Sequence, residues 1–174
     1  MGWLKEIALF GLSAGLTVAA MEAGASWYFG GAFPHLNVYE ADPVLGARLR
    51  PGETQRLAFA GNPAAGVPAT DIRINSWGYR GGDWTLETGG NVLVVGDSQV
   101  FGLGVQAHET FSAVLQEELG RPVFNAGVPT YGPQEYAAVA EELGEDLDAD
   151  VVIAVINLYN DLFEAGLDNR HRHA

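Results

Sequence analysis

A serine stands at the end of an apolar run, in the tripeptide Gly96-Asp97-Ser98. The preceding residues, Asn91 to Val95, have the composition of a buried strand. A small, tight turn after such a strand places a hydroxyl group at the carboxyl end of a sheet, which is where ligands bind in open α/β sheets. A helix that begins there adds free backbone N–H groups. The tripeptide therefore predicts either a nucleophilic serine or a serine that merely caps a helix.

Two further strand ends carry small or polar residues. Pro122 to Gly127 predicts a second strand that ends in glycine, and Asp150 to Asn157 predicts a third strand, closed shortly afterwards by Asn160. An acyl-transfer site needs a nucleophile and hydrogen-bond donors aimed at the developing oxyanion. The N–H groups of Ser98 and Gly127 and the side-chain amide of Asn160 could be those donors.

The order and spacing of these residues resemble the SGNH, or GDSL-type, hydrolase family: Gly-Asp-Ser at 96–98, then Gly127, then Asn-Asp at 160–161. Asp42 to Gly46 and Asn75 to Gly81 resemble the lead-in of membrane-anchored bacterial members. The resemblance covers roughly residues 36 to 165 and departs at Leu158, where the third block usually has glycine. It implies a flavodoxin-like, three-layer α/β fold, a nucleophile at Ser98 and oxyanion positions at Gly127 and Asn160.

The general base that the resemblance implies is not evident in the sequence. The family supplies it from an Asp-x-x-His block that follows two further strands, whereas this sequence ends at Ala174. Asp168 to His171 fits the pattern but follows Asp161 too closely to leave room for those strands. His171 is therefore a candidate base whose spacing is explained more simply by coincidence. We expect a truncated domain, with no imidazole within about 2.6–3.2 Å of the Ser98 hydroxyl.

Two classes of function remain open. Without a base, a serine hydroxyl stays protonated and is a poor nucleophile. The sequence therefore favours a non-catalytic accessory or structural subunit of a bacterial membrane protein complex. The alternative is a serine esterase or O-acyltransferase that acts on exported substrates through Ser98.

Composition excludes several other functions. The formal net charge is −13 with only 9 lysines and arginines, which argues against a nucleic-acid partner. The absence of cysteine excludes disulfides and thiol chemistry. Asp146 to Asp150 begins like a calcium loop, but Val151 and Asn157 stand where that loop needs glycine and glutamate. Gly102-Leu103-Gly104 lacks the third glycine of a dinucleotide-binding turn. We therefore expect neither a cofactor nor a metal site.

The N-terminal segment has the composition of a membrane span. Ile7 to Met21 contains no charge, and a single helix from about residue 4 to 28 would exceed the roughly 20 residues that a span needs. Trp27 to Phe29 would form an aromatic belt at one interface. Lys5 precedes the segment and the next basic residue is Arg48, so we expect a single pass through the bacterial inner membrane, with a cytoplasmic N-terminus and a periplasmic domain. Ala23 to Ala25 is a plausible signal-peptidase site, which keeps cleavage open.

Small residues recur on one face of this segment, at Gly11 and Gly15. Such a stripe lets another helix approach closely in the lipid bilayer. We therefore predict that membrane protein subunits pack on the Gly11/Gly15 face. The alternative is chance in a segment rich in alanine and glycine.

The remaining patterns divide the chain into three parts: a transmembrane anchor at 1–29, an extended Pro/Gly-rich lead-in at 30–90 and a partial SGNH-like α/β domain at 91–174. Asp71 to Asn75 allows a short strand within the lead-in. Thr110 to Leu119 has helical periodicity and ends at Gly120, and a second helix opens at Pro133 and runs to about Gly144. Strands that alternate with helices predict a mostly parallel sheet with right-handed crossovers.

The third expected strand should need a cover. Val151 to Ile156 is apolar on both faces, as in buried parallel strands, and the order of strands in the family would leave it without an outer neighbour. A long, bare apolar edge promotes aggregation. We therefore predict that this edge is covered, either by the tail after Leu162 or by a partner.

Overall fold

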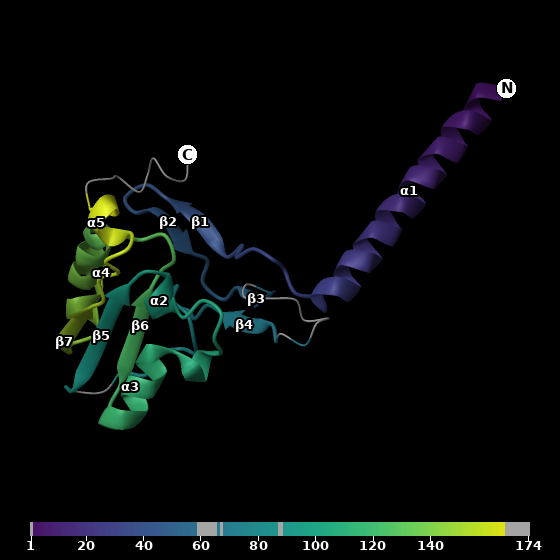
Figure 1. Ribbon diagram of the computed structural model, residues 1–174. Helices are drawn as coiled ribbons and strands as arrows, with labels where there is room; N and C mark the ends of the chain where they lie inside the picture. Colours follow the sequence, from purple (N-terminus) through teal and green to yellow (C-terminus); the bar gives the residue numbers. More distant parts are fainter. Residues whose placement is uncertain (1, 59–65, 67, 87–88, 166–174) are drawn as a thin grey trace.

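The computed structural model describes residues 2–58, 66, 68–86 and 89–165. These residues form a mixed α/β structure in which an N-terminal helix, α1 (Gly2–Phe29), extends away from the remaining strands and helices (Figure 1). The globular part is built around a parallel sheet. Its elements follow the order of strands and helices that the sequence patterns predict.

Helix α1 is 28 residues long, which corresponds to about 42 Å at 1.5 Å per residue. None of its described residues is buried. The helix is therefore long and apolar enough to cross a membrane, and it contains the predicted segment from about residue 4 to 28. A signal sequence near the N-terminus would have the same length and composition.

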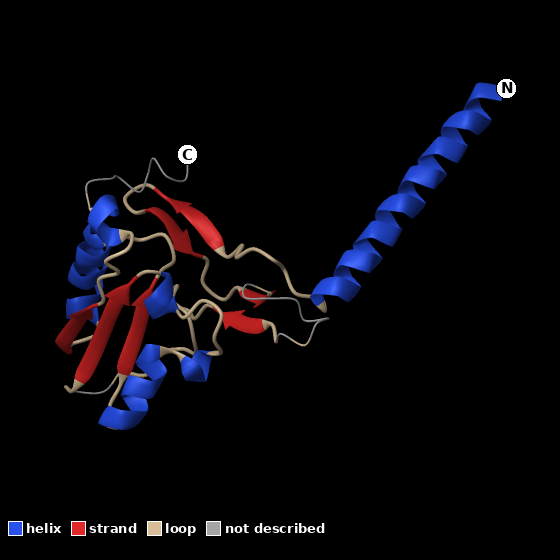
Figure 2. Ribbon diagram, in the orientation of Figure 1, coloured by secondary structure: helices blue, strands red, loops and turns tan. Residues whose placement is uncertain are grey.

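The central sheet has three described strands, β5 (Asn91–Gly96), β6 (Val123–Gly127) and β7 (Ala149–Ala154), in the order β6-β5-β7 (Figure 2). Both pairs are parallel, which confirms the prediction of a parallel sheet. β7 ends at Ala154 rather than at Asn157, because its last paired residue lies opposite Val95, near the end of β5. Every residue of β5 and β6 is buried.

The helices begin and end where local residue types dictate. Helix α3 (Phe111–Leu119) starts after Thr110, whose hydroxyl accepts a hydrogen bond from the Ala113 N–H, and stops at Gly120, which is left-handed with φ 62°. Helix α4 (Pro133–Asp146) opens with proline in its first turn and runs slightly further than predicted. Helix α4 contacts β5 and β7, and α3 contacts β6. The short helix α2 (Ser98–Phe101) contacts both β6 and β5.

The lead-in forms two antiparallel pairs of strands rather than a featureless extended segment. Its strands are β1 (Tyr39–Asp42) with β2 (Gly46–Leu49) and β3 (Thr54–Leu57) with β4 (Thr70–Arg73). Leu49, Ile74 and Tyr79 of the lead-in belong to the same buried hydrophobic cluster as Leu93 and Phe124 of the sheet. The lead-in is therefore part of the core that supports the sheet.

Strand β7 lies at one edge of the described sheet and is poorly covered. Val151 and Val152 point to opposite faces of a strand, yet they are 39% and 45% exposed. No described strand pairs with the outer edge of β7. The segment that follows Ala165 lies outside the described residues, so cover by that tail stays a prediction.

Candidate functional site

Ser98 is the first residue of α2 and follows directly on the turn at the carboxyl end of β5. The helix is capped by Asp97, whose Oδ1 accepts a hydrogen bond from the Gln99 N–H at 2.8 Å. The interpretation that Ser98 caps the helix is therefore wrong. Ser98 is half-buried, and its hydroxyl makes no hydrogen bond to a described residue.

Asn157 joins the ends of two strands through its backbone and side chain. Its amide Nδ2 donates to Asp97 Oδ2 at 3.0 Å, and its backbone N–H donates to Asp161 Oδ2 at 2.8 Å. Asp161 is fully buried and also accepts a hydrogen bond from the Tyr136 hydroxyl, which lies 3.2 Å from each carboxylate oxygen. These contacts confirm that Asp161 is held at the carboxyl edge of the sheet by the end of β7. They also fix the position of the turn that carries Ser98.

Gly127 plays a packing role at this edge. A Cβ on Gly127 would lie 2.3 Å from the Phe101 nitrogen and 2.7 Å from the Val100 carbonyl carbon, so only glycine lets α2 sit this close to β6. The Gly127 N–H donates to Asn125 Oδ1 at 3.0 Å. Because that donor is already engaged, this geometry does not present the free Gly127 oxyanion donor that the sequence predicted.

Asn160 follows β7 and is the N-cap residue of a one-turn helix, α5 (Asp161–Glu164). It is half-buried, and its backbone carbonyl accepts a hydrogen bond from the Phe163 N–H at 2.9 Å. The structure therefore places Asn160 beyond the carboxyl end of β7, one residue before the buried Asp161. The predicted hydrogen bond from the Asn160 amide to an oxyanion stays a prediction.

Thr130 is a candidate that sequence reasoning missed. It lies in the loop between β6 and α4 and has φ 86°, a left-handed conformation that non-glycine residues rarely adopt. Backbone strain of this kind concentrates at functional sites. The one signal in the sequence is that Thr130 lies in a short loop, Pro129 to Gly132, that follows a strand of buried residues.

Neither described histidine forms a hydrogen bond with Ser98. His35 is exposed in the lead-in and its carbonyl accepts from the Gln55 side chain at 2.6 Å. His108 is exposed in the short helix η2 (Ala107–Glu109). His171 lies outside the described residues. Within the part of the chain that the structure describes, no group of three or more acidic, histidine or cysteine side chains could hold a metal ion.

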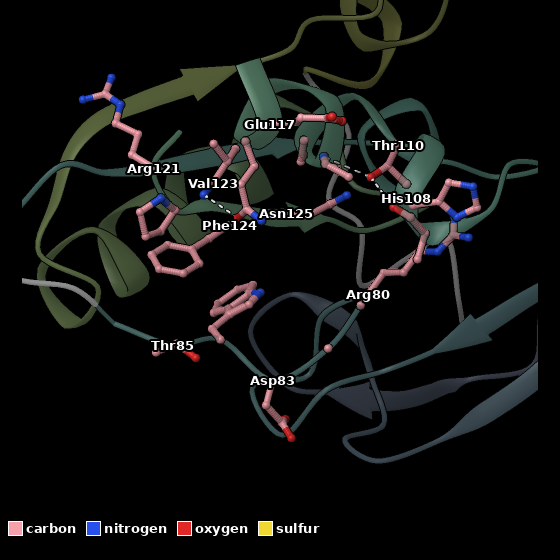
Figure 3. Close-up of a pocket in the computed structure, with 18 of the residues that line it drawn as sticks. Arg80, Asp83, Thr85, His108, Thr110, Glu117, Arg121, Val123, Phe124 and Asn125 are labelled. Carbon is pink, nitrogen blue, oxygen red and sulfur yellow. Dashed lines mark hydrogen bonds between the residues drawn. The ribbon is translucent and has the colours of Figure 1, made fainter. Parts of the chain in front are cut away.

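A groove of about 780 Å³ lies between the lead-in turn at 80–85, helix α3 and the first residues of β6 (Figure 3). Arg80 and Asp83 lie on the lead-in wall, and Thr110 and Glu117 on the opposite one. Ser98 does not line this groove. The groove and the serine turn are therefore separate features of the domain.

No protein-family model matches the chain, and no curated protein is significantly similar to it.

Proposed function

We propose that this chain is a membrane-anchored, non-catalytic accessory subunit whose SGNH-like domain binds a partner protein through its exposed apolar edge. One observation carries the proposal. Strand β7, the residues after it and helix α5 expose large apolar side chains, which we call the β7–α5 surface: Val151, Val152, Ile156, Leu158, Leu162 and Phe163.

The exposure of this surface is unusual for an α/β domain. Leu158 is 72% exposed and Phe163 is 79% exposed, although both follow a strand that pairs with the fully buried β5. Several exposed large apolar side chains at one edge of a domain typically mark an interaction site. Since the outer edge of β7 has no described neighbour, its backbone groups can also pair with an added strand. The expected partner therefore contributes an extended, apolar segment.

In this proposal, the interaction takes place at a membrane, because α1 is long and apolar enough to serve as an anchor. Helix α1 would hold the chain as a single pass in the bacterial inner membrane, with a cytoplasmic N-terminus and a periplasmic domain. Its Gly11/Gly15 face has nothing packed against it among the described residues, and a Cβ on either glycine would meet no atom within 4 Å. Membrane subunits that pack on this face would complete the complex.

A photo-cross-linking experiment tests the partner. A benzophenone amino acid is placed at Val152, on the β7–α5 surface, and at Glu117, an exposed residue of α3, as the matched control. In native membranes we expect an adduct with another membrane protein at position 152 and none at position 117. An adduct at position 152 that joins the chain only to its own tail would show that the surface is covered internally, and would refute the proposal.

A second candidate function is favoured by the position of Ser98. Ser98 is half-buried at the carboxyl end of the central strand. Asn157 holds the adjacent turn in place by donating hydrogen bonds to the carboxylates of Asp97 and Asp161. Ser98 thus has the position of a nucleophile in an SGNH-type serine esterase or O-acyltransferase. Exported acyl esters would be its substrates.

A fluorophosphonate probe on the intact, full-length chain separates the two functions. Stoichiometric labelling that is abolished by Ser98→Ala and by His171→Ala, but kept by the exposed control Ser76→Ala, would establish the esterase and reject the non-catalytic subunit. Absence of labelling would leave Ser98 without nucleophilic function. We expect no labelling.

A further inference from the structure

Arg80 makes an unusual set of contacts for an arginine in a lead-in segment. It is only 3% exposed, and its guanidinium group reaches the segment that follows the serine turn. Nη1 donates to the carbonyl of Phe101 at 2.9 Å and also to that of Gly102, and Nη2 donates to the carbonyl of Val105 at 2.5 Å. The guanidinium carbon also lies 5.1 Å from the centre of the Phe101 ring. Figure 3 shows the side chain leaving the lead-in and pointing toward the segment of His108 and Thr110.

Arg80 binds carbonyl groups at the carboxyl end of α2, the helix whose first residue is Ser98. Helix α2 has four residues, and Gly102 ends it in a left-handed conformation with φ 82°. The Gly102 and Leu103 N–H groups both donate to the Ser98 carbonyl, at 3.0 and 3.1 Å. One turn of helix is too short to be stable alone, because nucleation costs more than its few hydrogen bonds return. The conformation at Ser98 therefore depends on what holds the other end of α2.

The opposite side of α2 is fixed by the sheet. Gly127 and Gly96 leave room for the α2 backbone and for the Val100 side chain, so the helix lies directly on the ends of β6 and β5. On the side of the lead-in, Arg80 holds the carboxyl end of α2 through its hydrogen bonds to the carbonyl groups. The turn that presents Arg80 is itself fixed, because Asn75 Oδ1 accepts hydrogen bonds from the N–H groups of Trp77 and Tyr79.

Arginine suits this position better than lysine. Its planar group presents several donors at fixed angles, so that one side chain can bind three carbonyl groups, and a cation interacts favourably with the carboxyl end of a helix. Arg80 forms no ion pair with a described carboxylate, so these carbonyl groups are its compensation for burial. Desolvation lowers the pKa of Arg80 to about 10, which leaves the side chain charged at neutral pH.

We propose that Arg80 is a positioning residue for Ser98: by binding the carbonyl groups of Phe101, Gly102 and Val105, it holds α2 against the sheet and thereby sets the place of the serine hydroxyl. The relevance of this role to chemistry rests on the second candidate function, the Ser98 esterase. The role itself makes the lead-in a component of the serine site.

Hydrogen exchange of the full chain in detergent, read by mass spectrometry, tests the role. Arg80→Met removes the donors and keeps the bulk, and Arg80→Lys keeps the charge with a single donor group. Arg73→Met is the matched control, because the Arg73 side chain is 65% exposed and its one ion pair with a described residue, Asp83, is 3.9 Å long. We expect exchange in residues 98–105 to rise about tenfold or more in Arg80→Met, by a smaller factor in Arg80→Lys and not at all in Arg73→Met. Exchange in α4 should stay at the wild-type rate.

Two results would overturn the proposal: unchanged exchange in residues 98–105, or an equal rise in α4, which would show a general loss of stability. If Arg80→Met does not fold, the proposal is tested by comparing exchange in residues 98–105 and in α4 between Arg80→Lys and wild type. Fluorophosphonate labelling gives an independent answer on the esterase. If wild-type Ser98 is labelled, the rate should fall in the order wild type, Arg80→Lys, Arg80→Met; if it is not labelled, the esterase fails while exchange still decides the role of Arg80.

Discussion

Replacing Gly127 by alanine should displace the serine turn, and the structure gives the size of the effect. The new Cβ would lie 2.3 Å from the Phe101 nitrogen and 2.7 Å from the Val100 carbonyl carbon. Both are backbone atoms, so no change of rotamer relieves the clash, and α2 must move by about 1 Å to restore ordinary contact. Overpacking of this kind costs about 1–3 kcal/mol, of which the lower entropy of the unfolded alanine chain offsets about 0.4–1 kcal/mol.

We therefore expect Gly127→Ala to lower the free energy of unfolding by about 1–2 kcal/mol, and the Tm of a domain of this size by about 3–8 °C. Thermal unfolding in detergent, followed by near-ultraviolet circular dichroism, measures the shift. Gly144→Ala is the matched control: this glycine lies inside α4, and a Cβ there meets no atom within 4 Å. That variant should be more stable than wild type by about 0.5–1 kcal/mol. If the two variants change the Tm in the same direction, the close approach of α2 to β6 is wrong.

Three further results are expected. Asp42 accepts hydrogen bonds from two backbone N–H groups and an arginine, and these contacts outweigh burial and lower its pKa below the ordinary value of 3.8. The free energy of unfolding of wild type should therefore exceed that of Asp42→Asn by its full amount above pH 3.8, and this difference should disappear as the pH falls through the lowered pKa. Urea unfolding at several pH values measures the difference. Tyr131→Phe removes the 2.7 Å hydrogen bond to the Ala47 carbonyl and should cost about 1 kcal/mol in the same assay, whereas equal stability would exclude a role for that bond. Replacing Gly11 and Gly15 together by leucine should release the chain from its membrane complex in detergent, and unchanged co-purification would contradict helix packing on that face.

Local sequence patterns predicted the elements of the globular domain well. A continuous apolar run is enough to specify a buried parallel strand, so β5 and β6 begin and end within one residue of the predicted bounds. Helix α3 also follows from its own residues, since Thr110 caps its start and Gly120 can adopt the left-handed conformation at its end. These signals act within one turn or one strand, which is why a single sequence reveals them.

The third strand shows where such patterns stop being sufficient. The apolar run continues to Ile156, but β7 ends at Ala154, whose partner Val95 is the last residue of β5 that pairs with β7; Gly96, the final residue of β5, pairs with Gly127 of β6 instead. The length of a strand depends on its neighbour as well as on its own residues. The sequence therefore predicted the strand and its position at an edge, whereas the pairing set its end.

The candidate site was predictable in part. The sequence alone placed Ser98 at a strand end and Asp161 near it, because parallel strands share one carboxyl edge. Only the tertiary structure gave the cap to Asp97, engaged the Gly127 N–H with Asn125 and joined two strand ends through Asn157. The first two contacts join residues only two positions apart, but the sequence allows each of these donors several partners. The contact between Asn157 and Asp97 joins residues 60 positions apart, and no local pattern encodes such a meeting.

The sequence by itself determined the apolar N-terminal helix, the parallel strands and the acidic, cysteine-free character of the chain, since these follow from composition and short-range periodicity. The tertiary structure decided the part played by the lead-in. Its proline- and glycine-rich sequence predicted an extended segment, yet β1 to β4 fold into the common core and bring Arg80 to the end of the serine helix, 21 residues further along the chain. The physical reason is that a buried guanidinium group needs several hydrogen-bond acceptors around it, and packing of the whole domain brings three carbonyl groups to that place.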